Sequence, residues 1–283
     1  MKILENKISD QPLISSRRNS LVRRLRVLST NKGRIEFSSL LLEGTQLLKE
    51  ALKNCSIPHD VIATNSWYEK NHDLIQLIPK KVLFHRVTPE VLEASLTTIN
   101  PDGVAAIVPL SAIPQPPQKP NFILALDRLQ DPGNLGTLFR TALAAEVDCI
   151  WLSLGADPLS QKVLRASAGA VLKLPYVRLG ASEETSLEKL AEKLSVAAKS
   201  GFQVIATYVP QTSKSVCPYW ELDWNKPTVL VLGNEGSGLH SRIRDCCTNG
   251  VTLPHSDAVQ SLNVASAAVP LLLERQRAQI TSK

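Results

Sequence analysis

The fold is decided by residues 121–154, NFILALDRLQDPGNLGTLFRTALAAEVDCIWLSL. This stretch contains an apolar strand, a Pro-Gly turn, a helix that starts near Asn134, and a second apolar strand. Strands that are apolar throughout and are joined by helices are typical of a parallel sheet covered on both faces. The stretch therefore predicts an α/β domain.

The same alternation continues from this stretch to the C-terminus. We expect further strands at 173–179, 202–208 and 227–233, and helices at 160–169, 186–201 and 260–277. Gly201 is expected to end the second of these helices, and Pro270 to kink the last one or mark an irregular start. Ligands of such sheets bind beyond the carboxyl ends of the strands.

A smaller α/β pattern precedes this domain, within residues 35–108. It consists of an apolar run at 37–44, strand patterns at 60–65, 81–87 and 103–110, and helix patterns at 45–52 and 88–96. Thr45 is a possible cap of the first helix. Residues 109–120, PLSAIPQPPQKP, contain five of the 18 prolines of the chain. They predict an extended linker between two domains.

Basic residues gather at the N-terminus. Residues 1–34 carry nine lysines and arginines and two acidic residues, whereas the whole 283-residue chain has a net charge of only +6. Within them, SRRNSLVRRLRVL (16–28) predicts an amphipathic helix with a basic exposed side. A basic segment on a near-neutral body points to a polyanion such as nucleic acid, although a merely solvated basic helix fits the charge equally well. The candidate RNA-binding residues are Arg17, Arg18, Arg23, Arg24 and Arg26.

Composition excludes several classes of protein. Hydrophobic residues make up 43% and charged residues 20% of the chain, which is the balance of a globular protein. No apolar stretch is long enough to span a membrane, and the first residues lack the apolar core of a secretory signal. The five cysteines have no zinc-type spacing. We therefore expect a cytoplasmic protein without a membrane span or a metal.

Three loops follow strands where the sheet rule places ligands. The first leads to Asn134, the second is GNEGSGL (233–239), and the third, around 253–263, contains Ser261 and Asn263. Three glycines in the second loop let the backbone approach a ligand closely. Each loop also has a structural interpretation. Asn134 and Ser261 are possible helix caps, Glu235 a possible exposed bystander, and Arg140 a possible solvated or paired helix residue.

In order and content, the three loops resemble the signature motifs of the SpoU-type RNA ribose 2′-O-methyltransferases, a branch of the trefoil-knotted methyltransferase superfamily. The resemblance covers about 120–279 and extends more weakly to the first domain. Glu146, Gln161 and Pro270 depart from the family pattern. The matching residues are Asn134, Gly136, Arg140 and Thr141, then Gly233, Asn234, Glu235, Gly236 and Gly238, then Pro254, Ser261, Leu262, Asn263, Val264 and Ala265.

The resemblance implies a C-terminal parallel-sheet α/β domain with a deep trefoil knot, and a smaller ribosomal-protein-like α/β domain that binds RNA. It implies S-adenosylmethionine as the methyl donor and a homodimer whose active site is completed near the subunit interface. The expected organisation is a basic extension (1–34), a substrate-binding domain (35–108), a linker (109–120) and the knotted catalytic domain (121–283).

The resemblance also implies roles for residues. Arg140 is the proposed activator of the ribose hydroxyl, Asn134, Ser261 and Asn263 hold its geometry, and Glu235 is a candidate to orient Arg140 or a neighbour. Because a guanidinium stays protonated at neutral pH, binding the adjacent phosphate and stabilising the developing alkoxide is an equal alternative for Arg140. The expected cofactor-binding residues are Leu232, Gly233, Asn234, Glu235, Gly236, Leu253, Pro254, Ser261, Leu262, Asn263 and Ala265.

Ribosomal RNA is the expected substrate in preference to tRNA, because the extra N-terminal domain recurs among the ribosomal RNA enzymes of the family. One alternative is a non-catalytic RNA-binding or ribosome-assembly protein on the same fold. Another is an unrelated nucleotide-binding α/β enzyme, but the sequence lacks both the GxGxxG and the GxxxxGK[ST] fingerprints.

Overall fold

The chain forms two compact units in a computed structural model that describes residues 11–54, 56–208 and 216–281. Unit 1 contains the described residues up to Ile113 together with Leu159–Lys173, and unit 2 contains Pro114–Pro158 and the described residues from Leu174 onward. The division at Ile113 falls within the proline-rich stretch. No sequence pattern indicated that 159–173 packs with the N-terminal part of the chain.

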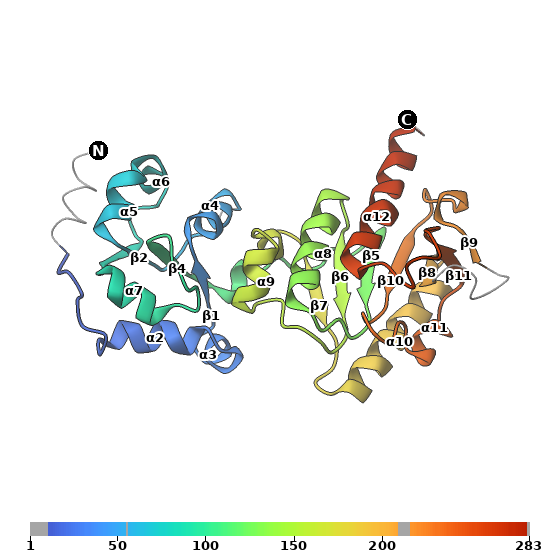
Figure 1. Cartoon of the computed structure of the whole chain (residues 1–283), viewed down its shortest axis with the longest axis horizontal. Helices are drawn as coiled ribbons and strands as arrows, with labels where there is room; N and C mark the ends of the chain where they lie inside the picture. The colour runs from blue at the N-terminus through green and yellow to red at the C-terminus, as the bar shows by residue number, and fades with distance from the viewer. Residues whose placement is uncertain (1–10, 55, 209–215, 282–283) are drawn as a thin grey trace. The chain divides into compact units, whose positions relative to one another are not determined.

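Unit 2 is built on a seven-stranded sheet in which every neighbouring pair is parallel, in the order β7-β6-β5-β10-β8-β11-β9 (Figure 1). The predicted α/β class is therefore confirmed. The strands are β5 (Phe122–Leu126), β6 (Cys149–Leu152), β7 (Tyr176–Arg178), β8 (Gln203–Tyr208), β9 (Val216–Pro218), β10 (Thr228–Leu232) and β11 (Asn249–Thr252).

Helices cover both faces of this sheet, as uniformly apolar strands require. Leu190 and Leu194 of α10 pack on Ile123, Val229 and other residues of one face. On the other side α8 and α12 pack against each other. The helices of unit 2 are α8 (Pro132–Ala144), α10 (Glu183–Lys199), α11 (Ser241–Arg244) and α12 (Val264–Thr281).

The helix ends differ from the expected ones. Helix α8 begins at Pro132, and the carboxylate of Asp131, not Asn134, caps it by accepting from the backbone N–H of Asn134 at 2.7 Å. Asp and Asn are equally good caps, so the sequence alone did not choose between positions three residues apart. Helix α10 begins at Glu183 behind a capping box of Ser182 and Thr185, and Gly201, with φ +90°, follows its end.

Helix α12 also starts differently from the expectation. The Oδ1 atom of Asn263, not the Ser261 hydroxyl, accepts from the backbone N–H groups of Ala265 and Ser266, at 2.9 and 3.1 Å. The expected helix start near 260 is therefore moved to Val264, and the helix runs on through Pro270. No helix of the described residues is long and apolar enough to cross a membrane.

Unit 1 has a four-stranded sheet in the order β1-β4-β2-β3, with β2 and β3 parallel and the other pairs antiparallel. Asp102, and not Thr45, caps α4 by accepting from the backbone N–H of Thr45 at 2.8 Å. The strands are β1 (Ser39–Glu43), β2 (Asp60–Ala63), β3 (Leu83–Arg86) and β4 (Val104–Pro109). The helices are α2 (Ser20–Leu28), α3 (Asn31–Glu36), α4 (Thr45–Lys53), α5 (Asn65–Lys70), α6 (His72–Gln76), α7 (Pro89–Ser95) and α9 (Gln161–Ala166).

The basic helix α2 is part of the core of unit 1. Its Leu21, Leu25 and Leu28 are buried against residues of β1, β2 and β4, as the amphipathic pattern predicted. The inserted segment 159–173 is held by polar contacts. Gln161 donates to the carbonyl oxygen of Leu41 at 2.8 Å, and Arg165 pairs with the buried carboxylate of Glu43 at 3.1 Å.

Candidate functional site

A cavity of about 460 Å³ lies in unit 2 at the carboxyl ends of β8, β10 and β11. The ends of three strands and the start of α12 meet there, at the edge of the sheet where parallel α/β folds bind ligands. Ten of the residues expected from the sequence line it: Asn134, Leu232, Gly233, Asn234, Glu235, Gly236, Leu253, Ser261, Leu262 and Asn263. Pro254, Ala265 and Arg140 do not.

A chain of side-chain hydrogen bonds joins the three loops at this cavity. Asn134 Nδ2 donates to Glu235 Oε1 at 3.2 Å, and Asn263 Nδ2 donates to Asn134 Oδ1 at 2.9 Å. Each residue comes from a different loop, so the contacts fix the positions of all three loops together. With both amide atoms engaged, Asn134 has one orientation in this network.

The Glu235 carboxylate is held by donors on the first loop. Its oxygens accept from the backbone N–H groups of Gln130 and Asp131, at 3.2 and 3.1 Å, as well as from Asn134. Partial burial raises the pKa of Glu235, but these hydrogen bonds outweigh it, and the pKa lies below its ordinary value. Glu235 is therefore ionised at neutral pH and acts as an acceptor that ties the second loop to the first.

The second loop is closed tightly on itself. Asn234 and Gly238 exchange backbone hydrogen bonds of 3.0 and 3.1 Å, and Asn234 Oδ1 accepts from the N–H groups of Gly236 and Ser237. A Cβ atom on Gly233 would lie 2.4 Å from the carbonyl carbon of Gly238, whereas one on Gly236 would have only Asn234 Oδ1 nearby, at 3.7 Å. Gly233 is therefore required by the loop itself, and Gly236 leaves open space at the cavity.

Arg140 lies outside the cavity. It is exposed, and no ion pair or hydrogen bond joins its side chain to another residue of the described parts of the chain. Six residues of α-helix correspond to a rotation of about 240°, so Arg140 points away from the side on which Asn134 lies. Glu235 accepts hydrogen bonds from Gln130, Asp131 and Asn134, and within the described residues it forms no hydrogen bond or ion pair with Arg140.

The walls of the cavity combine apolar side chains with a few polar groups. Leu232, Leu253 and Leu262 are among the residues expected from the sequence, and Leu239 and Leu271 add to the apolar surface. Such a lining, with convergent polar atoms, is typical of small-molecule sites of this size. Sequence reasoning missed Thr207, Tyr208 and His255 on the wall. The strand-end rule applied to β8 was the available signal for the first two.

The predicted RNA-binding arginines have different surroundings in unit 1. Arg17, Arg18 and Arg23 are exposed. Arg24 pairs with Asp60 at 3.1 Å, and Arg26 Nε donates to the carbonyl oxygen of Ala94 at 2.6 Å. Two of the five cations therefore also hold α2 to the rest of unit 1.

Comparison with known proteins places these features in context. The model of the SpoU rRNA methylase family matches residues 121–272, and that of the MRM3-like substrate binding domain matches 19–106. An uncharacterized tRNA/rRNA methyltransferase of Synechocystis sp. is 42% identical over 96% of each chain. The 23S rRNA (guanosine(2553)-2′-O)-methyltransferase RlmP of Bacillus subtilis is 28% identical over 92% of this chain and 97% of its own length.

A solved structure gives the same picture. The AdoMet-bound rRNA methyltransferase from Sinorhizobium meliloti aligns with a TM-score of 0.74 and 29% identity, covering 94% of this chain and 97% of its own. The alignment therefore spans both units.

Proposed function

Because the chain belongs to the SpoU rRNA methylase family, we propose that it methylates a ribose 2′-hydroxyl of ribosomal RNA. Its activity class is that of an RNA 2′-O-methyltransferase that uses S-adenosylmethionine. The observation that carries the proposal is the hydrogen-bonded chain Glu235–Asn134–Asn263, which joins all three family motifs at one cavity.

The cavity suits the methyl donor in size and chemistry. S-adenosylmethionine supplies an electrophilic methyl group on a sulfonium centre. A volume of about 460 Å³ lies within the range for ligands of this class. The leucines at 232, 253 and 262 would hold the flat adenine, and the exposed backbone at Gly236 and Gly238 would contact its edge.

The remaining task of the chain is to position the ribose and to stabilise its 2′-oxygen as the hydroxyl proton passes to solvent. Glu235 is a poor proton acceptor, because its lowered pKa makes the carboxylate a weak base and its oxygens already accept several hydrogen bonds. Arg140 carries a guanidinium cation, which would bind the phosphate beside the ribose and stabilise the developing alkoxide. Asn134 and Asn263 keep the cavity in shape for in-line attack.

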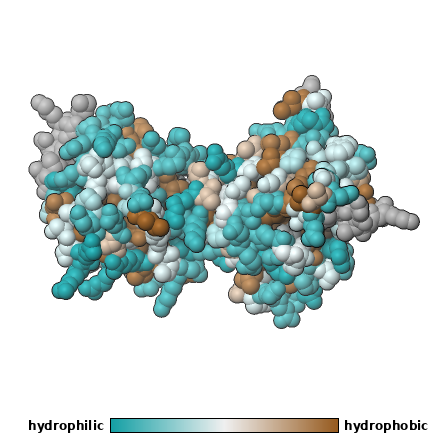
Figure 2. Space-filling view, viewed as in Figure 1, coloured by the Kyte–Doolittle hydropathy of each residue, from teal (hydrophilic) through white to brown (hydrophobic). Residues whose placement is uncertain are grey.

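We propose a homodimer that brings Arg140 of a second copy to the cavity. Arg140 is exposed on α8 and lies outside the cavity of its own chain. On α12, Val269, Leu273 and Ile280 are 38%, 41% and 70% exposed. Their spacing places them within about 40° of one another around the helix. They form an apolar stripe suited to a second copy, and Figure 2 shows hydrophobic surface at the C-terminal end of α12.

Ribosomal RNA is favoured over tRNA by the relatives. The name of RlmP identifies it as a 23S rRNA methyltransferase, and the match to the MRM3-like substrate binding domain covers most of unit 1. We propose residues 35–108, extended by α2, as the substrate-binding domain and 121–283 as the catalytic domain. The trefoil knot that the resemblance implies would lie in this catalytic domain. The described cysteines are free thiols, which fits the proposed cytoplasmic location.

The proposal is tested by incubating the full chain with S-adenosylmethionine labelled in its methyl group and, in parallel, unmodified ribosomal RNA and unmodified tRNA. We expect label on ribosomal RNA, at a linkage that resists alkali as a 2′-O-methyl site does, and no label with Arg140→Ala. Donor binding without transfer to naked RNA or ribosomal subunits would instead indicate a non-catalytic RNA-binding protein.

A further inference from the structure

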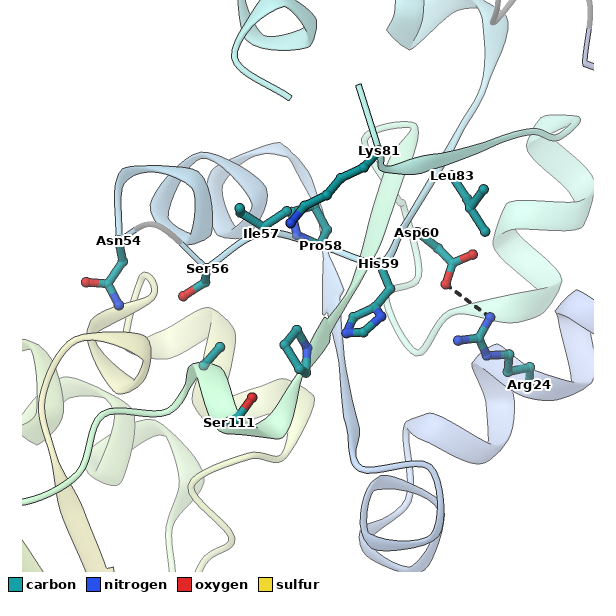
Figure 3. A pocket seen from close by; sticks show the side chains of 12 residues that line it. Arg24, Asn54, Ser56, Ile57, Pro58, His59, Asp60, Lys81, Leu83 and Ser111 are labelled. Atoms are coloured by element: carbon teal, nitrogen blue, oxygen red, sulfur yellow. Dashed lines mark ion pairs between the residues drawn. The ribbon is translucent and has the colours of Figure 1, made fainter. Parts of the chain in front are cut away.

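Unit 1 contains a larger cavity, of about 850 Å³, which lies outside the three motifs. It lies at the end of the four-stranded sheet where β2 and β3 begin and β4 ends, and Arg24 of α2 forms one side (Figure 3). We propose that this cavity binds an unstacked nucleotide of the RNA substrate, with its phosphate on the surrounding cations. The inference rests on the proposed function, because it names the surface that would hold the RNA.

Three cationic or ionisable side chains surround the opening. Figure 3 shows Lys81, His59 and Arg24 around the same opening. Lys81 and His59 are exposed, and neither side chain has a hydrogen bond or ion pair within the described residues. They are therefore available to a phosphate, which accepts hydrogen bonds from several donors at once.

Arg24 is fixed in place by a buried carboxylate. Asp60, whose side chain is 4% exposed, pairs with Arg24 at 3.1 Å and with His85 Nε2 at 2.7 Å. Burial raises the pKa of Asp60, but the hydrogen bonds and charges of His85 and Arg24 outweigh it. The pKa of Asp60 therefore lies below its ordinary value, and the carboxylate stays ionised. A guanidinium has five N–H donors, so most of those on Arg24 remain for a ligand.

The rest of the wall suits a nucleobase. Ile57 and Leu83 are 37% and 59% exposed and give the wall aliphatic surface. Polar atoms lie beside it. Ser56 is buried on this wall, and its hydroxyl has no hydrogen bond to another described residue. Asn54 uses its Nδ2 on the carbonyl oxygen of Leu172, at 2.6 Å, which leaves its Oδ1 as an acceptor.

A second cavity continues the surface. It has a volume of about 570 Å³ and is lined by Arg23, Arg24, Phe37 and His85 among others, so Arg24 belongs to both cavities. Phe37 is 44% exposed and offers a ring for stacking. Two adjoining cavities with an arginine between them fit two successive nucleotides of a single strand and the phosphate that joins them.

Charge favours RNA over a protein partner. Among the described residues that line the two cavities, Asp60 is the only acidic one, and its charge is neutralised by Arg24. The surface is therefore positive over both cavities. Exposed Arg17 and Arg18 precede the same helix, and they extend the positive surface toward a polyanion.

The test compares Lys81→Ala with Lys70→Ala, a matched exposed lysine of unit 1 that lines neither cavity. The probe is a fluorescently labelled single-stranded RNA of twelve mixed nucleotides, titrated with the full chain between 0.05 and 0.2 M KCl. One phosphate contact to a single strand changes the slope of log K against log salt by about 0.7. Lys81→Ala should therefore bind about fivefold more weakly at 0.1 M salt and lose that slope, whereas Lys70→Ala should match wild type.

A second measurement locates the contact. Replacing uridines of the probe by 4-thiouridine should give photo-crosslinks to peptides containing residues 56–60 or 81–83. Equal affinities of the two lysine variants, or crosslinks confined to unit 2, would overturn the inference and leave the cavity for a protein. Methyl transfer by wild type to unmodified ribosomal RNA is measured in parallel. Absence of that transfer counts against the proposed function, whereas intact transfer with unchanged Lys81→Ala binding counts against this surface alone.

Discussion

Asn263 donates a hydrogen bond of 2.9 Å from its Nδ2 atom to the Oδ1 atom of Asn134, which lies 129 residues earlier in the chain. The same Asn263 caps α12 through its Oδ1 atom, and the same Asn134 donates to Glu235. Two amides thus connect the start of the last helix to the first and second loops. The positions of the three loops around the cavity therefore depend on this contact.

We expect Asn134→Asp to disrupt the cavity. The new carboxylate would replace the amide donor that faces Glu235 Oε1 at 3.2 Å, and two like charges would then meet. Loss of a hydrogen bond to a charged group costs about 1.5–3 kcal/mol. S-adenosylmethionine affinity, measured by calorimetry, should fall at least about tenfold. Asn100→Asp adds the same charge at an exposed position of unit 1 and should leave affinity unchanged. Equal effects of the two variants would contradict the role of Asn134.

Glu235 predicts the behaviour of unit 2 in acid. Because its folded-state pKa is lowered, its contribution to stability is complete above the ordinary carboxyl value of 4.5 and is lost as pH falls through the lowered value. Melting curves of wild type should therefore decline more between pH 5 and pH 3 than those of Glu235→Gln, which lacks that titration. Parallel declines of the two proteins would show that Glu235 is not held by the donors of the first loop.

Two glycines of the second loop should respond differently to alanine. Gly233→Ala places a Cβ atom 2.4 Å from backbone of Gly238, so the loop must move. Gly236→Ala meets only Asn234 Oδ1, at 3.7 Å, which is ordinary contact. We expect Gly233→Ala to lower the melting temperature and abolish S-adenosylmethionine binding. Gly236→Ala should melt like wild type. A Gly233→Ala protein with normal affinity would contradict the tight closure of the loop.

The apolar stripe on α12 predicts the oligomeric state. Leu273→Asp places a charge in the middle of the stripe formed with Val269 and Ile280, and burial of an unpaired charge in an interface is costly. Sedimentation velocity should show a dimer for wild type and a monomer for Leu273→Asp. Val196→Asp, which changes a 57% exposed valine of α10, should remain dimeric. A monomeric wild type would contradict the proposed homodimer.

The sequence predicted the parts of the fold that depend on local pattern. Strands such as Phe122–Leu126 and Thr228–Leu232 were found because buried parallel strands are apolar throughout. Very short strands such as Val216–Pro218 and Asn249–Thr252 lack that signal and were missed. The packing of 159–173 in unit 1 depends on contacts such as Gln161 to Leu41, 120 residues apart, which no local pattern reports.

The candidate site was predicted in its composition but less well in its geometry. The loops containing Asn134, Glu235 and Asn263 do meet at one cavity. The sequence could not show which residue would cap each helix, because several suitable residues precede both α8 and α12. The sequence did not place Arg140 relative to the cavity, and a spacing of six residues turns a helix to another face than that of Asn134.

Arg140 gives the sharpest test of how the site is assembled. Arg140→Ala removes an exposed side chain without described partners, so melting temperature and S-adenosylmethionine affinity should be unchanged. Methyl transfer should fall by about 10²–10³, the usual cost of losing one donor to a developing oxyanion.

If Arg140 acts on the partner's cavity, mixing Arg140→Ala with Gly233→Ala subunits should restore transfer, because one site of the mixed dimer then has both an intact cavity and an arginine. Recovery depends on subunit exchange, which a tagged pull-down of the mixture checks. A mixed dimer without activity would place Arg140 on the cavity of its own chain, reached by a movement of α8.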